Sequence, residues 1–479
     1  IRRATDNTPW QSKQEITMRP FWLEQALRGE ASDAPALQGA VNADVCIVGG
    51  GFTGLWTALQ LKRANPHLDV VLIEADICGA GASGRNGGCL LTWETRFLTL
   101  RRLFGESEAL RLVEASRQTV DKITAFCREH RIDAQIRVDG TLYTATSAAQ
   151  IGSAEAVKAA LDERGIGSFV SLDVEEVRRR AGSKRHLAGD FSPVAATVQP
   201  ALLVRGLRRV ALEMGVRLYE KTAFESLSYV PGPLVRTTYG EVRAKRVVLA
   251  INAWMAKTFP QFERSIALVS SDMIITERAP EILERLGFRN GLSVLDSRTF
   301  VYYYRTTPDG RLMLGKGGNT FAYGGRVLPV FDQPSPYRAA LARDLSGFFP
   351  ELAGVPIAAS WNGPSDRSAT GLPFFGRLDE RHDVFYGFGY SGNGVGPSYM
   401  GGEILSSLVL GLDNAWTRSP LVRGPRGVFP PEPIRYVGSL VVRDAIRRKE
   451  SAEDAGAKPW FFDVALSRLA QAAGKSDKA

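Results

Sequence analysis

The chain reads ADVCIVGGGFTGLWTALQLKRANPHLDVVLIEADICGAGASGRNGG from Ala43 to Gly88. Asp44 to Val48 is a short apolar run rich in β-branched residues, which predicts a buried parallel strand. Leu55 to Arg63 has helical character, and Asp69 to Ile73 predicts a second buried strand. This order of elements predicts a complete βαβ unit.

Three glycines stand between the first strand and the helix, in the pattern Gly49-x-Gly51-x-x-Gly54. The first permits a tight turn, the second lets a pyrophosphate approach the backbone, and the third lets the helix pack closely on the strand. The helix N-terminus offers N–H groups and partial positive charge to phosphates. Glu74 follows at the end of the second strand, where a carboxylate can accept hydrogen bonds from ribose hydroxyls. The unit predicts dinucleotide binding, and Glu74 disfavours NADP because it would repel the 2′-phosphate.

A second glycine-rich run, GAGASGRNGG from Gly79 to Gly88, favours FAD over NAD as the expected cofactor. A simple dinucleotide-binding dehydrogenase normally continues here with another strand and helix. This run instead offers Ser83, Arg85 and Asn86 among five glycines. Such a loop can lie against a flavin and its diphosphate, because residues without side chains permit close approach.

The motifs GGGFTGL and GASGRNGG, together with Glu74, resemble the D-amino-acid-oxidase-like flavoprotein superfamily, which includes glycine, sarcosine and γ-glutamylputrescine oxidases. The resemblance covers about residues 20 to 415. Within the superfamily, PFWLEQAL around Phe21, GGCLLTW from Gly87 and DGTLYTAT from Asp139 are most similar to the aminophosphonate oxidoreductases. The resemblance implies an α/β fold: a Rossmann-like FAD-binding domain with a parallel βαβ sheet, and a substrate domain with a mixed or antiparallel sheet.

The motifs and the resemblance together give a set of expected FAD contacts. They are Gly49, Gly51, Phe52, Thr53, Gly54, Glu74, Ala75, Ser83, Arg85, Asn86, Gly87, Gly88, Phe224, Ala250, Asn252, Trp254, Gly392, Asn393, Gly394 and Val395. The last four precede a predicted helix, whose N-terminus can stabilise negative charge on the flavin N1–C2 carbonyl region. We expect non-covalent FAD, because the cysteine that sarcosine oxidases attach to flavin would fall near Pro364, and no cysteine occurs beyond Cys127.

The length of 479 residues is too great for one compact core, so several structural units are expected. We expect an N-terminal arm over 1–40 and a discontinuous FAD-binding domain over 41–100, 191–260 and 361–414. The substrate domain should take 101–190 and 261–360, with a helix from Ala109 to His130. Residues 415–479 form a C-terminal extension, a candidate for homo-oligomer contacts, whose last residues, GKSDKA, are expected to be disordered.

Composition restricts the possible partners. The net charge is +9, but the basic residues are spread along the chain and aromatic residues do not interleave with them, which argues against nucleic acid. This charge is compatible with an anionic small substrate. No apolar run reaches the ~18 residues of a membrane span, and no signal peptide is evident, so the cytoplasm is the expected compartment. The four cysteines and four histidines form no metal-binding pattern, so no metal is expected.

The segment VYYYRTTPDGRLMLGKGG predicts a β-hairpin, because Pro308-Asp309-Gly310 is a strong turn signal between two strand-like runs. Period-two alternation puts Tyr302 and Tyr304 on one face, and Tyr303 and Arg305 on the other. With a two-residue loop Tyr304 pairs with Met313, whereas a bulged turn shifts the pairing by one.

The resemblance implies oxidation of an amine C–N bond, with hydride passing to the flavin and O2 or another acceptor reoxidising it. The sarcosine-oxidase branch has an oxygen-activating lysine in an LKLG-like strand, where this chain has Met313. Either Lys316 acts in its place through a bend at Gly315, or oxygen reacts poorly and another acceptor serves. Met313 is equally compatible with an ordinary core position. Met313, Lys316 and Tyr304 are therefore the catalytic candidates.

The position of the glycine-oxidase arginine that clamps a substrate carboxylate is occupied here by Ser365. A substrate anion must therefore find another cation, for which Arg305 is the first choice, followed by Lys316 and Arg326. Tyr302 is expected as an aromatic wall. The leading hypothesis is oxidation of an aminophosphonate, such as 2-aminoethylphosphonate or its N-methyl form. A γ-glutamylputrescine-like polyamine or amino-acid oxidase, which for a polyamine calls for acidic pocket residues, and a non-catalytic flavin-binding protein are the alternatives.

Overall fold

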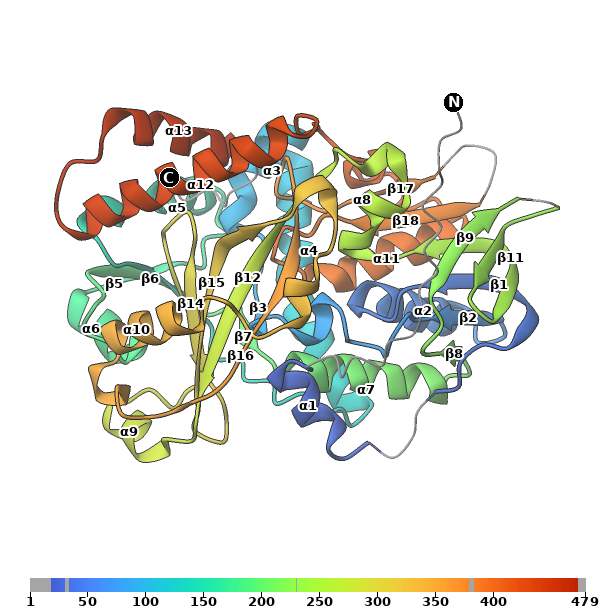
Figure 1. Ribbon diagram of the computed structural model, residues 1–479, viewed down its shortest axis with the longest axis horizontal. Helices are drawn as coiled ribbons and strands as arrows, with labels where there is room; N and C mark the ends of the chain where they lie inside the picture. The colour runs from blue at the N-terminus through green and yellow to red at the C-terminus, as the bar shows by residue number, and fades with distance from the viewer. Residues whose placement is uncertain (1–18, 31–33, 230, 379–382, 473–479) are drawn as a thin grey trace, which may run out of the picture.

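A computed structural model describes residues 19–30, 34–229, 231–378 and 383–472. Within these ranges the chain forms two eight-stranded sheets and one two-stranded sheet, with helices around and between them. Figure 1 shows β1, β2 and β11 at one end of the molecule and β12, β14 and β15 toward the other. The α/β class and the presence of a mixed second sheet are confirmed.

The first sheet has the strand order β17-β18-β11-β1-β2-β8, and a hairpin of β9 and β10 pairs with β11. Its strands are β1 (Gly39–Val48), β2 (Val70–Ile73), β8 (Arg217–Tyr219), β9 (Phe224–Ser228), β10 (Leu234–Thr237), β11 (Gly240–Leu249), β17 (Phe374–Arg377) and β18 (Val384–Phe388). Neighbouring strands from β18 to β8 are parallel. Helix α2 (Phe52–Ala64) connects β1 to β2, so the predicted βαβ unit is confirmed.

The second sheet has the order β16-β12-β15-β14-β13-β4-β6-β5 and is antiparallel except where β13 meets β4. Its strands are β4 (Thr141–Ala145), β5 (Val170–Leu172), β6 (Ala188–Ser192), β12 (Ile266–Thr276), β13 (Ser293–Asp296), β14 (Tyr302–Thr306), β15 (Leu312–Phe321) and β16 (Ile357–Ser368). Two short strands, β3 (Cys89–Leu90) and β7 (Ala196–Thr197), form the small sheet.

The predicted hairpin is present as β14 and β15, but Tyr304 pairs with Leu314 and Arg305 pairs with Met313. The pairing that a two-residue loop would give, Tyr304 with Met313, is therefore wrong, and the one-residue shift is correct. The reason is the longer connection, in which Thr307 N–H bonds to Arg311 and Gly310 adopts a left-handed φ of 80°.

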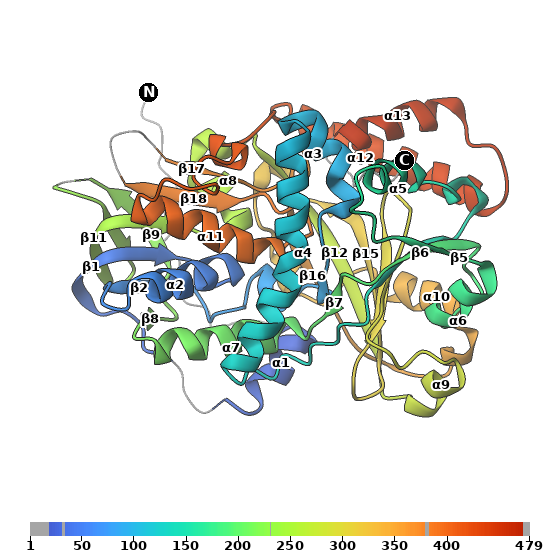
Figure 2. The same cartoon turned by 180° about the vertical axis from the view of Figure 1, so that it is seen from behind.

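Helices cover both sheets. They are α1 (Phe21–Leu27), α3 (Phe97–Phe104), α4 (Glu106–Glu129), α5 (Glu155–Asp162), α6 (Val174–Ala181), α7 (Pro200–Glu213), α8 (Met255–Thr258), α9 (Pro280–Arg285), α10 (Arg338–Phe348), α11 (Pro397–Leu410), α12 (Ile434–Asp454) and α13 (Phe461–Ala472). Figure 2 shows α4 running between the two sheets. Although α4 was expected in the substrate domain, it packs into the core of the first sheet, where Phe126 meets Trp56 edge-on at 4.9 Å.

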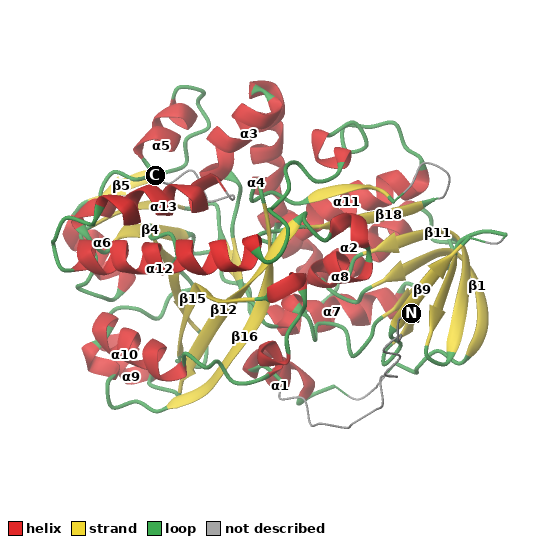
Figure 3. Ribbon diagram, turned by 45° about the horizontal axis from the view of Figure 1, so that its top comes forward, coloured by secondary structure: helices red, strands yellow, loops and turns green. Residues whose placement is uncertain are grey.

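The C-terminal extension folds back onto the second sheet. Helices α12 and α13 lie together over this half of the molecule (Figure 3). Glu450 accepts the Thr299 N–H at 2.9 Å, and Asp454 accepts from the buried Arg298 at 2.5 Å. Residues 415–472 therefore belong to the body of the protein. The tail expected to be disordered and most of the N-terminal arm lie outside the described residues.

Candidate active site

The turn after β1 is shaped by close approach of neighbouring segments. Gly49 has a φ of 111°, and a Cβ at Gly50 would lie 2.4 Å from the Cys78 sulfur. A Cβ at Gly54 would lie 2.0 Å from the Gly49 carbonyl oxygen. Gly51 caps α2 without a side chain, and the next N–H, that of Phe52, donates to Ser83 Oγ at 2.8 Å. The turn thus presents bare backbone at the start of a helix, which suits a phosphate group.

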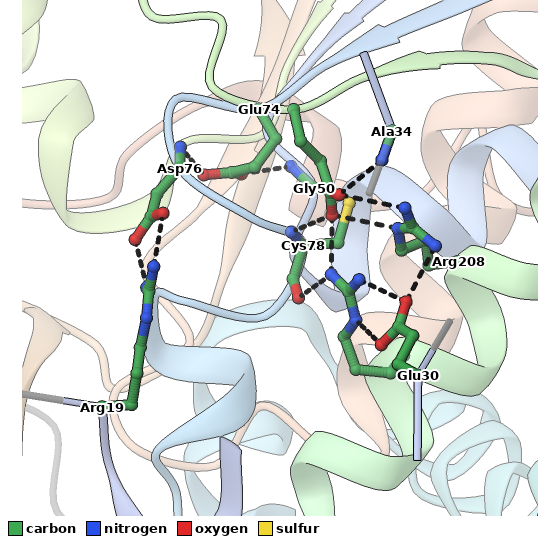
Figure 4. Close-up of polar contacts among 10 residues, drawn as sticks. Arg19, Glu30, Ala34, Gly50, Glu74, Asp76, Cys78 and Arg208 are labelled. Atoms are coloured by element: carbon green, nitrogen blue, oxygen red, sulfur yellow. Dashed lines mark hydrogen bonds and ion pairs between the residues drawn. The ribbon is translucent and has the colours of Figure 1, made fainter. Parts of the chain in front are cut away.

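Glu74 follows β2 and reaches back to this turn (Figure 4). One carboxylate oxygen accepts the Gly50 N–H at 2.7 Å, and the other accepts the Asp76 N–H at 3.1 Å. Each oxygen can accept a further bond, so the carboxylate has capacity left for ribose hydroxyls. Burial raises the pKa of Glu74 to about 7, although both backbone bonds act in the opposite direction.

A buried ion network supports the segment that follows β2. Glu220 accepts the Cys78 N–H at 2.7 Å and is bound by both Arg205 and Arg208, which also contact Glu30 (Figure 4). Glu220 is fully buried, and its two arginine partners and the N–H bond outweigh burial, so its pKa lies below the ordinary value. The network fixes Cys78 directly beneath the Gly50 backbone, where it supports the turn.

The second glycine-rich segment is held in shape by Asn86. Its amide donates to the Ser83 carbonyl at 2.9 Å, and its Oδ1 accepts the Gly88 N–H at 2.8 Å. Arg85, which we expected to contact the cofactor, donates to the Phe331 carbonyl at 2.5 Å and to Asp332 at 2.6 Å. The Arg85 guanidinium therefore ties this segment to the chain before α10.

The remaining expected cofactor residues lie after β2 and β11, at the start of β9 and in the loop before α11. Asn252 has a left-handed φ of 47°, and its buried Oδ1 has no hydrogen-bond partner among the described residues. The Oδ1 of Asn393 is buried and unpartnered in the same sense. Ala250 and Val395 are buried, and Gly394 is partly exposed. Trp254 is 42% exposed beside Gly81, Phe224 packs on Phe259, and Ala75 is exposed. The two orphaned amide oxygens and the bare glycine turns fit a polar, flat ligand such as FAD.

One face of the second sheet meets these segments, and we call it the inner face. It consists of Ser271, Met273 and Ile275 of β12, Tyr303 and Arg305 of β14, Met313, Gly315 and Gly317 of β15, and Trp361, Gly363, Ser365 and Arg367 of β16. A Cβ at Gly87 would lie 2.6 Å from the Tyr303 ring and 3.3 Å from Met313 Cε. Trp361 Nε1 donates to the Arg85 carbonyl at 2.8 Å. The inner face and the glycine-rich segment are therefore in contact.

Tyr303 and Met313 form the middle of the inner face. The Tyr303 ring lies across Gly315, where a Cβ would approach the ring to 2.2 Å, and its hydroxyl lies 2.7 Å from Ser271 Oγ. Burial holds the pKa of Tyr303 well above its usual range, so the phenol stays protonated. Met313 is buried in a cluster with Trp22 of α1 and Trp361. Among the catalytic candidates, Met313 alone lies on the inner face.

Arg305 lies on the inner face, but its N–H groups are engaged. Its guanidinium donates to the carbonyls of Gly87 at 2.6 Å and Val198 at 2.8 Å and lies over the Trp22 ring. Arg305 is 2% exposed, and burial lowers its pKa to about 10. The first choice for a substrate cation is therefore corrected: Arg305 clamps two backbone segments together.

Lys316, Tyr302 and Tyr304 lie on the opposite face of the sheet, so we remove them from the candidate site. Lys316 Nζ donates to the Tyr302 hydroxyl at 2.6 Å, which in turn donates to Asp344 of α10. Tyr304 donates to the Ala181 carbonyl at 2.9 Å. The strand continues regularly through Gly315, so no bend brings Lys316 to the other face. Arg326 is exposed on the loop after β15, and it too is removed.

Two polar residues of β16 remain as candidates for binding a substrate on the inner face. The sequence alone predicted only one of them, Ser365. Ser365 is 9% exposed and its Oγ has no hydrogen-bond partner among the described residues. Arg367 lies two positions further on the same strand and therefore on the same face. The period-two alternation that placed the tyrosines of β14 also puts Ser365 and Arg367 on one face, since both belong to β16. It could therefore have identified Arg367 from the sequence.

Asp366, between them, points to the other side and anchors the loop before α11. Its carboxylate accepts the backbone N–H groups of Gly389, Tyr390 at 3.1 Å and Ser391 at 3.3 Å. Burial raises the pKa of Asp366 to about 6. This contact fixes the path of the chain into Gly392, so β16 positions both the inner face and the glycine-rich loop beside it.

No helix in the described ranges is long and apolar enough to cross a membrane. All four cysteines are free, and Cys46, Cys78 and Cys127 are buried. None of them lies on the inner face, so non-covalent attachment of the cofactor stays a prediction.

Comparisons with known proteins agree with this geometry. Residues 44–408 match the family model described as DAO, FAD dependent oxidoreductase. The chain is 32% identical to γ-glutamylputrescine oxidoreductase of Escherichia coli (strain K12) over 78% of this chain and 85% of that protein. It is 25% identical to glycine oxidase of Geobacillus kaustophilus (strain HTA426) over 79% of this chain and 95% of that protein.

The crystal structure of glycine oxidase from Geobacillus kaustophilus superposes with a TM-score of 0.67 at 23% identity, covering 81% of this chain and 99% of that chain. The likeness covers most of this chain, which agrees with the expected fold. The βαβ unit, the bare glycine turns and the match over most of the chain lead to one conclusion: this protein belongs to the DAO family of FAD-dependent oxidoreductases.

Proposed function

We propose that the protein oxidises the C–N bond of a small amine that carries an anionic group, and that an aminophosphonate is its substrate. The observation that supports this is the charge of the inner face. The four strands that form it carry two arginines and no carboxylate on that side. A polyamine would call for acidic side chains there, whereas a phosphonate calls for Arg or Lys donors.

Bound FAD would supply the redox chemistry by accepting a hydride from the α-carbon of the amine, which leaves an imine that hydrolyses to a carbonyl compound. We propose that the backbone from Gly49 to Gly54 holds the pyrophosphate and that Glu74 holds the adenosine ribose. Asn252 and Asn393, whose Oδ1 atoms are orphaned, are proposed to accept hydrogen bonds from the cofactor. The inner face then forms the wall that orients the substrate.

For 2-aminoethylphosphonate the products would be phosphonoacetaldehyde, ammonia and, with oxygen as acceptor, H2O2. The N-methyl form would give methylamine in place of ammonia. The test is a panel containing both compounds, γ-glutamylputrescine, putrescine and glycine, followed by anaerobic flavin bleaching and aerobic peroxide detection. We expect the aminophosphonates to bleach the flavin fastest. Faster bleaching by putrescine or glycine would overturn the proposed substrate class.

A second candidate is a γ-glutamylputrescine-like substrate, which is favoured by the identity of 32% to the Escherichia coli protein of that name. The same panel separates the two, because each compound is offered at equal concentration. Bleaching without peroxide would identify a dehydrogenase that passes electrons to another acceptor. The sequence agrees with this outcome, because Met313 stands where the sarcosine-oxidase branch has its oxygen-activating lysine.

A further inference from the structure

We infer that Arg367, together with Ser365, binds the anionic head group of the substrate on the inner face. The inference rests on the proposed function and supplies the cation that Arg305, Lys316 and Arg326 do not provide. No hydrogen bond or ion pair joins the Arg367 side chain to any described residue, although Arg367 is only partly exposed.

Two glycines keep the space around this guanidinium open. A Cβ at Gly392 would lie 3.3 Å from Arg367 Nη2 and 3.3 Å from Ser365 Oγ, and one at Gly317 would lie 3.8 Å from the same nitrogen. Gly392 also has a left-handed φ of 83°. The two glycines come from β15 and from the loop before α11. Arg367 therefore lies where the substrate sheet and the proposed flavin-binding loop meet.

The second observation is the unpartnered hydroxyl of Ser365. Its Oγ is buried, and both it and Arg367 Nη2 lie equally close to the Cβ position at Gly392. A buried hydroxyl normally has a hydrogen-bond partner, so an unpartnered one beside an unpaired guanidinium points to a missing acceptor. An oxyanion supplies such acceptors: it can accept from the arginine fork and from the serine together.

Arg305, on the same face, is a buried arginine with a structural role, and it serves as the comparison for Arg367. Arg305 donates to the Gly87 and Val198 carbonyls and lies over Trp22. Arg367 has no such contacts, and burial lowers its pKa, while nearby Asp366 and Tyr303 act the other way. A cation in a partly desolvated position that forms no hydrogen bond or ion pair with a described residue gains most from an anionic ligand.

The test uses the FAD-loaded enzyme and ethylphosphonate, which has the head group but no amine to oxidise. Its Kd is measured from the change in flavin absorbance and, independently, from the rise in the unfolding temperature. We expect Arg367→Met to raise this Kd at least tenfold, equivalent to about 1.4 kcal/mol. Arg367→Lys should recover part of the affinity, and Ser365→Ala should weaken binding about threefold. Arg326→Met is the matched control and should leave the Kd unchanged.

Other outcomes would overturn either the role of Arg367 or the aminophosphonate substrate. The inference is overturned if Arg367→Met leaves the Kd for ethylphosphonate unchanged, or if Arg326→Met loses as much affinity as Arg367→Met. It is also overturned if the Arg367→Met protein loses FAD but still binds ethylphosphonate normally. If the enzyme oxidises 2-aminoethylphosphonate but Arg367→Met does not affect its KM, the proposed function stands and the inference fails. If propionate binds in an Arg367-dependent manner while ethylphosphonate does not, the anion site stands and the aminophosphonate substrate is wrong.

Discussion

The glycine turns beside β1 and the inner face of the second sheet use their residues in opposite ways. The turns work through the absence of side chains: Gly49 and Gly54 let neighbouring backbone pack closely, and Gly51 leaves backbone bare for a ligand. The inner face works through the presence of side chains contributed by four strands. A local motif is sufficient for the first kind of site. A site of the second kind depends on which residues of distant segments share a face of the sheet. The pairing register and the alternation of side chains along each strand decide this.

The largest expected effect concerns the turns. Gly51→Val places a branched side chain where the pyrophosphate must approach the backbone, so we expect FAD to be lost entirely. The protein should still fold, because a Cβ there meets only the Ser83 hydroxyl, at 3.0 Å. The ratio of flavin to protein absorbance and far-UV circular dichroism measure the two effects. Gly29→Val, in open space, is the control. A folded Gly51→Val protein with full FAD would contradict the assignment of the turn.

The next effect tests whether Arg305 belongs to the fold. Arg305→Met leaves the Gly87 and Val198 carbonyls without this donor, at a cost of about 1–3 kcal/mol for each buried acceptor. We expect a matching fall in the free energy of unfolding by urea, with Arg326→Met unchanged. Kinetic constants for charged and neutral amines should fall by similar factors. A selective loss for the anionic amine would return Arg305 to the substrate site.

A smaller effect concerns Glu74 and pH. In cofactor-free protein its pKa is about 7, against an ordinary value of 4.5. Between these values the folded state holds a proton that the unfolded chain has released, so the free energy of unfolding falls as pH rises through this window. Glu74→Gln should remove this fall, which is at most about 3 kcal/mol. Groups such as Asp366 titrate in both proteins and cancel in the difference.

Thermal unfolding of both cofactor-free proteins from pH 4 to 8 measures the effect. FAD should shrink it, because ribose hydroxyls would donate to the carboxylate and favour its charged form. Identical pH profiles for Glu74→Gln and the natural protein would show that the Glu74 proton is not retained on folding.

The contrast between the two regions also explains what the sequence could predict. The βαβ unit, the hairpin and α11 were all predicted, because each is a local pattern of apolar spacing and glycines. The family and its cofactor followed from the same motifs. The site on the second sheet was only partly predicted. Lys316 and Arg305 attracted attention by type and position, but the Lys316 side chain bonds to Tyr302 on the far face and the Arg305 N–H groups bond to carbonyls.

Arg367 was missed for a physical reason as well. Its environment is made by Gly317 and Gly392, which are 75 positions apart in the sequence and meet only when β15 and the loop before α11 come together. The position of α4 is a similar case. Its apolar stripe predicts a helix, but the stripe does not specify which of two cores buries it.

The smallest expected effect tests the placement of Lys316 itself. Lys316→Met removes a hydrogen bond to the Tyr302 hydroxyl, and we expect about 1 kcal/mol of lost stability. Reoxidation of the reduced flavin by O2, followed in a stopped-flow instrument, should change less than twofold, because the Lys316 side chain lies on the face away from Gly87. If Lys316 activated oxygen, its loss would instead slow this rate at least tenfold, which corresponds to about 1.4 kcal/mol in the barrier.

Met313→Lys is the informative partner variant, since Met313 lies on the inner face beside Gly87. If the inner face governs the reaction with oxygen, a lysine there should raise the rate, while the same residue at 316 remains without effect.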